Sequence, residues 1–95
     1  MHEGQATISP DILARYASDA AREVDGVHSV TGRRGVKVSD VGGVLRVEVH
    51  ICIDWGASIP AVGAAVRSRV RDYLTHMAKA GGADVEVVVD EIAAP

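Results

Sequence analysis

The chain has 95 residues, 47% of them hydrophobic and 24% charged, with a formal net charge of −3. This length allows a single domain, expected over residues 1–95 with its core at about 6–92, and leaves no room for a second domain with a cleft between the two. A nucleic-acid binder of this size normally carries a strong positive excess, so the charge argues against DNA or RNA as a partner.

Two further features of the composition concern location. No apolar run approaches the roughly 20 residues that span a bilayer, and the start, MHEGQATISP, has no apolar signal core. Cys52 is the single cysteine, which excludes an internal disulfide and suits a reducing cytoplasm. We therefore expect a cytoplasmic chain whose association with a membrane, if it has one, depends on a partner.

The stretch ISPDI predicts the start of a first helix at about residues 10–25. Ser9 suits the N-cap and Pro10 the first helical position, where a missing N–H costs nothing. Ile8 and Leu13 have the spacing of a hydrophobic staple, and Gly26 is placed to end the helix. The apolar face is predicted to contain Ile12, Leu13, Tyr16, Ala17, Ala20 and Val24.

A strand-rich region follows. VHSV at 27–30 predicts a short strand, TGRRG at 31–35 a loop, VKV at 36–38 the start of a strand, and SDVGG at 39–43 a turn. VLRVEVHICID at 44–54 alternates strictly, which is typical of a strand with one covered and one wetter face. The covered row is Leu45, Val47, Val49, Ile51 and Ile53; the wetter row is Arg46, Glu48, His50, Cys52 and Asp54.

The second helix is expected from Ser58, its cap, to the glycines at 81 and 82. Its buried stripe is predicted to be Val62, Val66, Val70, Tyr73, Leu74 and Met77. DVEVVVDEI at 84–92 predicts a final strand, which should run parallel to 44–54 because a helix crosses over between them. The fold class is therefore α+β: a two-layer sandwich with a small mixed sheet and both helices on one face.

The wetter row raises the question of a metal or a catalytic site. His50, Cys52 and Asp54 are metal-ligand types at i, i+2 spacing, and His28 is a candidate fourth ligand. The row lacks the CxxC or HxxxH spacing of a metal motif, and a polar strand face or a dimer-covered face explains it better. Cys52 is better explained as a half-buried small hydrophobe than as a nucleophile, because no oxyanion donor set accompanies it.

The stretch DWGASIP at 54–60 is interpreted as a strand-to-helix corner, because Asp54 would repel an anion at the start of the second helix. Trp55 is the candidate for a protein contact at this corner, since indoles are enriched at interaction hot spots. Arg67 and Arg71 share a flank of the second helix, and Arg69 lies on the opposite border with Asp72 and His76. The flank is either an ordinary solvated surface or a contact for an acidic partner or lipid.

The segments ISPDILARYASDAAREVDGV, WGASIPAVGAAVRSRV and VEVVVDEI resemble the alkaline shock protein family, the Gls-type envelope stress response proteins of bacteria. The resemblance covers about residues 6–92. It implies a non-enzymatic cytoplasmic scaffold or adaptor without catalytic residues or cofactor, acting through self-association and a membrane-anchored partner. Two departures from longer members stand out: the loop after the first helix is short, and a charged carboxy-terminal extension is missing.

The same element order also resembles small iron–sulfur cluster assembly domains, which place a cysteine at the entry of the second helix. Here Ala57 and Ser58 stand at that entry, while Cys52 lies within the preceding strand. An iron–sulfur or other metal-binding role is therefore the alternative to the adaptor role, and topology alone does not decide between them.

Overall fold

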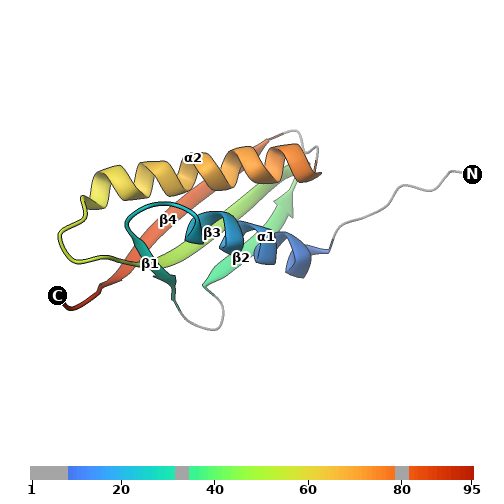
Figure 1. Ribbon diagram of the computed structural model, residues 1–95. Coiled ribbons are helices and arrows are strands. Elements are labelled where there is room, and N and C mark those ends of the chain that lie inside the picture. Colours follow the sequence, from blue (N-terminus) through green and yellow to red (C-terminus); the bar gives the residue numbers. More distant parts are fainter. Residues whose placement is uncertain (1–8, 32–34, 79–81) are drawn as a thin grey trace, which may run out of the picture.

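The computed structural model describes residues 9–31, 35–78 and 82–95. In these ranges the chain forms two helices and four strands, in the order α1 (Pro10–Arg22), β1 (Val27–Val30), β2 (Val36–Val41), β3 (Val44–Ile53), α2 (Ile59–Ala78) and β4 (Ala83–Ile92). Both helices lie on the same face of the sheet (Figure 1), so the predicted two-layer α+β sandwich is confirmed.

The strand β3 is the centre of the sheet. The strand β4 runs parallel to it along one edge, with Val47 opposite Val85 and Val49 opposite Val87, as the crossover through α2 requires. On the other edge β2 pairs antiparallel with residues 44–49 of β3 and β1 with residues 51–53. The strands β1 and β2 therefore lie end to end along one edge, and β4 alone occupies the other.

His50 spans the gap between β1 and β2. Its carbonyl accepts the N–H of Thr31 at 2.9 Å, and its own N–H donates to the carbonyl of Gly35 at 2.6 Å. The backbone of β3 thus stays hydrogen-bonded where the neighbouring edge is interrupted, as buried backbone groups must be.

The predicted helix starts are confirmed. The hydroxyl of Ser9 accepts a hydrogen bond from the N–H of Ile12, and Pro10 occupies the first turn of α1. Ser58 accepts in the same way from Ala61 at the start of α2. The end predicted for α1 near residue 25 is too late: the helix ends at Arg22, and Glu23 caps it. Ile8, the predicted staple partner of Leu13, lies outside the described residues, as does Gly81.

The turn predicted at 39–43 is tighter than expected. Val41 pairs directly with Val44, so only Gly42 and Gly43 form the hairpin loop. Both glycines have positive φ, of 60° and 87°, the combination of a type I′ turn, whose twist matches the flanking strands. The residues Ser39 to Val41 consequently extend β2.

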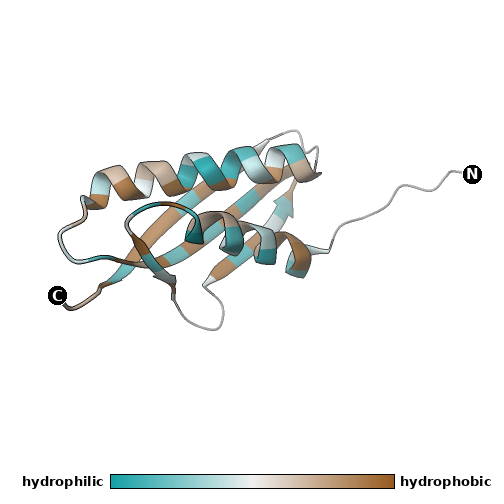
Figure 2. Cartoon of the chain, viewed as in Figure 1, coloured by the Kyte–Doolittle hydropathy of each residue, from teal (hydrophilic) through white to brown (hydrophobic). Residues whose placement is uncertain are grey.

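Aliphatic side chains from α1, α2, β3 and β4 form the core between the layers. Hydrophobic and hydrophilic residues alternate along the strands in Figure 2, and the predicted covered row of β3 is buried. The core contains Leu13, Ala17, Ala20, Ala21, Leu45, Val47, Val49, Ile51, Ile53, Val62, Val66, Val70, Leu74 and Val85.

Three residues predicted for the helix faces are exposed, and two others, Tyr16 and Val24, are partly buried. Ile12 is 44% exposed, and Tyr73 and Met77 are each 36% exposed. The ring of Tyr73 lies edge-on to the ring of Tyr16, with 6.0 Å between their centroids. The end of α2 therefore packs against α1 as well as the sheet, which places Tyr73 at the border of the core.

Candidate functional site

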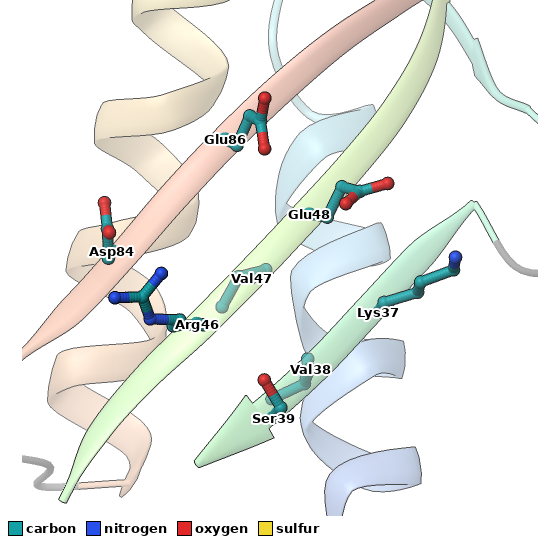
Figure 3. A pocket seen from close by; sticks show the side chains of 8 residues that line it. All are labelled: Lys37, Val38, Ser39, Arg46, Val47, Glu48, Asp84 and Glu86. Atoms are coloured by element: carbon teal, nitrogen blue, oxygen red, sulfur yellow. The ribbon is translucent and has the colours of Figure 1, made fainter. Parts of the chain in front are cut away.

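The face of the sheet opposite the helices is the candidate site, and we call it the open face. Its side chains come from β2, β3 and β4, and Figure 3 shows the charged ones, such as Arg46, Asp84 and Glu86, on the side of the sheet away from the helices. A shallow depression on it is lined by Lys37, Val38, Ser39, Arg46, Val47, Glu48, Asp84 and Glu86.

Charge on the open face is arranged by strand register. Lys37 lies opposite Glu48, and Arg46 lies opposite Asp84; these opposite charges are favourable cross-strand neighbours. Glu48 also lies opposite Glu86, which places two carboxylates side by side. Like charges directly opposite each other are unfavourable. The two carboxylates also make the β4 side of the open face acidic.

His50 lies between two carboxylates on the open face. Its Nδ1–H donates to Asp90 at 2.9 Å, and its Nε2–H donates to Glu48. The hydroxyl of Thr31 donates to the same Asp90 oxygen at 3.0 Å. The cluster therefore connects the end of β1 to β3 and β4, beside the break between β1 and β2.

The cluster perturbs the acidity of its members in opposite directions. Hydrogen bonds to Glu48 and then Asp90 raise the pKa of His50 above its usual value. The hydrogen bond with His50 lowers the pKa of Glu48, and hydrogen bonds from His50 and then Thr31 lower the pKa of Asp90. Since both ring nitrogens face acceptors, the arrangement favours the imidazolium.

This cluster should make stability depend on pH. A raised histidine pKa contributes stability that is complete below the unfolded value of about 6.5 and is lost as pH rises through the folded pKa. The lowered carboxylate pKa values contribute stability above an unfolded value of about 4, which is lost as pH falls through the folded ones. His50→Gln should therefore lower the free energy of unfolding most between about pH 4 and about pH 6.5. Urea unfolding measured from about pH 3 to about pH 9 would test this.

The variant His28→Gln is the matched control, because His28 contacts a single exposed carboxylate, that of Asp54, at 3.2 Å. We expect His28→Gln to lower the free energy of unfolding by less than His50→Gln does over the same pH range. Parallel stability curves for His50→Gln and the unmodified chain at all pH values would contradict the role of the cluster.

The residues of the wetter row that were considered as metal ligands are not assembled into one site. His28 contacts Asp54, whereas His50 contacts Glu48 and Asp90. Cys52 is buried, at 4% exposure, although half-burial was expected on this wetter face. Register shifts in β1 and β4 place Ser29 and Glu91 opposite Cys52. The Sγ of Cys52 lies 3.8 Å from the carbonyl oxygen of Ile53. Within 9–31, 35–78 and 82–95, no group of three or more His, Cys, Asp or Glu residues is arranged for a metal ion.

Comparison with known protein families matches residues 1–94 to the alkaline shock protein 23 family, described as having a cell envelope-related function. The chain belongs to this family. Among curated relatives, the uncharacterised protein YqhY of Bacillus subtilis is 31% identical over 91 residues, covering 80% of this chain and 67% of YqhY. The family resemblance carried by WGASIPAVGAAVRSRV and its flanking segments is thereby confirmed.

Solved structures similar to this family member include variants of a MamM CTD. One variant has a TM-score of 0.63 and 18% identity, covering 85% of this chain and 94% of the other; a cadmium form has a TM-score of 0.65 and 18% identity, covering 87% and 98%. At this identity the likeness shows a shared fold. Neither helix in the described part of the chain is both long and apolar enough to cross a bilayer.

The three predicted contact residues lie at different places on this family member. Trp55 follows the end of β3 and is 65% exposed. Arg67 lies on the side of α2 that faces β4, in a groove with Val87, about 12 Å along the helix axis from Ile59. Arg71 lies one turn further along α2, and its Nε is 3.6 Å from Oδ1 of Asp72.

The prediction that Arg69 lies on the opposite border of α2 is confirmed. Its guanidinium is 3.3 Å from the carboxylate of Glu23, at the end of α1. Sequence reasoning missed the partners of His50, because Asp90 and Thr31 lie 40 and 19 residues away along the chain and carry no shared motif. The available signal was parallel pairing of β4 with β3, which places the acidic end of β4 beside His50.

Proposed function

We propose that the chain is a non-enzymatic cytoplasmic adaptor of the bacterial envelope stress response, which associates with copies of itself and with a membrane-linked partner. The observation that carries this proposal is the open face. Both helices lie on the other side of the sheet, so the charged side chains of β2, β3 and β4 are presented to the surroundings. A shallow charged surface suits contact with another protein better than enclosure of a reactant.

Exposed apolar residues at the ends of the sheet add to this support. Trp55 is 65% exposed beside the start of α2, and Val41 and Val44 are 53% and 41% exposed at the hairpin. Burial of an exposed tryptophan ring against a partner contributes strongly to the free energy of binding. Arg67 and Arg71 lie on α2, in the helix layer, and are expected to add charge contacts with a partner on that side of the molecule.

The proposal predicts how three variants behave. Trp55→Ala should weaken association by at least about tenfold, because it removes an apolar anchor. A double reversal, Arg67→Glu with Arg71→Glu, should also weaken it, because both charges on this flank of α2 change sign. Sedimentation velocity would measure self-association, and affinity capture from envelope-stressed cells would measure recovery of a membrane-linked partner.

The control is Arg15→Glu, which reverses a single charge on the exposed side of α1. It should leave association unchanged, and circular dichroism should report unaltered helix content in all variants. Unchanged sedimentation together with unchanged partner capture for Trp55→Ala and the double reversal would reject the proposal.

A further inference from the structure

The unpaired edge of β4, together with the neighbouring side of α2, forms a second surface that differs in chemistry from the open face. In the described sheet β4 pairs with β3 alone, so its other edge has no strand beside it. A groove of about 390 Å³ runs between this edge and α2. Its lining includes Ile59, Gly63, Ala64, Val87 and Val89.

The backbone at this edge is oriented for pairing. The carbonyl of Gly82 accepts the N–H of Leu45, so Gly82 directs its backbone groups toward β3. Since these groups alternate along a strand, Val85, Val87 and Val89 direct theirs toward the free edge. The side chains of the same three residues line the groove. A strand added here would thus form hydrogen bonds and bury side chains against the same residues.

Charge specifies what the added strand must present on each side. Toward the open face β4 presents the exposed carboxylates of Asp84, Glu86 and Asp90, and Glu86 already has Glu48 as its neighbour on β3. A basic side chain beside Glu86 would lie within cross-strand distance of a carboxylate. On the groove side Arg67 repels a cation, and the surrounding aliphatic residues accept aliphatic ones.

The same charges oppose the most obvious alternative occupant, a second copy of β4. Pairing two such strands across a twofold axis would bring the carboxylates of one copy beside those of the other, which is unfavourable. Charged side chains on an edge strand are a common means of preventing pairing of that kind.

We propose that the groove between α2 and β4 binds an extended segment of a partner protein as an added strand, with aliphatic residues toward α2 alternating with basic residues toward the open face. This inference rests on the proposed adaptor function and names the chemistry of the partner segment. The backbone hydrogen bonds supply affinity, and the groove and the carboxylates of β4 supply selectivity.

A titration of the full-length, isotope-labelled chain with a short synthetic peptide of alternating valine and lysine would test the proposal. We expect amide shifts and slowed exchange at Val85, Val87 and Val89. A valine–glutamate peptide should bind at least about tenfold more weakly, and Glu86→Lys should narrow or reverse that preference.

Gly63 offers a way to block the groove without disturbing the core. A Cβ built at this helical position has no neighbouring atom within 4 Å. We expect Gly63→Leu to weaken peptide binding by at least about tenfold, because its side chain fills the groove. The control, Gly63→Ala, should fold at least as well as the unmodified chain and retain most of its affinity, because alanine favours helix and adds a single carbon.

Three outcomes of the peptide titration would overturn the inference. They are absence of binding at millimolar peptide, binding unaffected by Gly63→Leu, and equal binding of the valine–glutamate peptide. Concentration-dependent shifts at the β4 amides without peptide would assign the edge to a second copy and also overturn it. Trp55 does not line the groove and the titration needs no cellular partner. Failure of the titration would therefore leave the Trp55 result unchanged, and failure of the Trp55 prediction would leave the titration unchanged.

Discussion

Replacing Gly26 with alanine is expected to lower the free energy of unfolding by about 2–4 kcal/mol, because the change combines backbone strain with a steric clash. Gly26 has a φ of 96°, and a Cβ there would lie 2.6 Å from Cγ2 of Val62. Val62 is 7% exposed and has a short, rigid side chain, so it cannot move aside without disturbing the core. Urea unfolding followed by circular dichroism would measure the loss.

Gly56 supplies the matched control, since it separates strain from clash. Its φ is 86°, close to that of Gly26, yet a Cβ at Gly56 meets no atom within 4 Å. Gly56→Ala should therefore cost only the backbone strain, about 1–2 kcal/mol. If both variants lose the same stability, the close approach of the turn after α1 to α2 does not constrain the fold.

The sequence was sufficient for the features governed by local chemistry. Ser9, Pro10 and Ser58 act at the helix starts as their side-chain chemistry predicts. The alternation along residues 44–53 predicted which side of β3 the helices cover, and an intervening helix predicted the parallel pairing of β4. Period and capping are properties of a few neighbouring residues, which is why they could be read from the chain.

The features that the sequence did not reveal depend on register between distant segments. Burial of Cys52 follows from irregular pairing in both β1 and β4, and no local pattern indicates a bulge there. The cluster of His50, Glu48 and Asp90 likewise requires the exact register of β4 against β3. Among the predicted contact residues, Arg67 lies in the groove beside β4, a position that helical spacing alone could not indicate.

Replacing Ile51 with alanine should cost about 2–5 kcal/mol, since it removes a large aliphatic side chain from the centre of the core and leaves a cavity. Ile51 is 0% exposed beneath the helices, on the strand β3 that pairs with both edges of the sheet. Denaturant unfolding would measure this loss, and the slope of the transition should stay unchanged if the fold is retained.

Ile92→Ala makes the identical chemical change at the end of β4, where the side chain is 50% exposed. It should cost about 1 kcal/mol or less, because little apolar surface returns to water. The contrast tests whether the stability of the sheet comes from the side chains that are buried beneath the helices, such as Ile51, rather than from aliphatic residues at its exposed end. Equal losses for the two isoleucines would mean that burial beneath the helices does not determine how much an aliphatic side chain of the sheet contributes to stability.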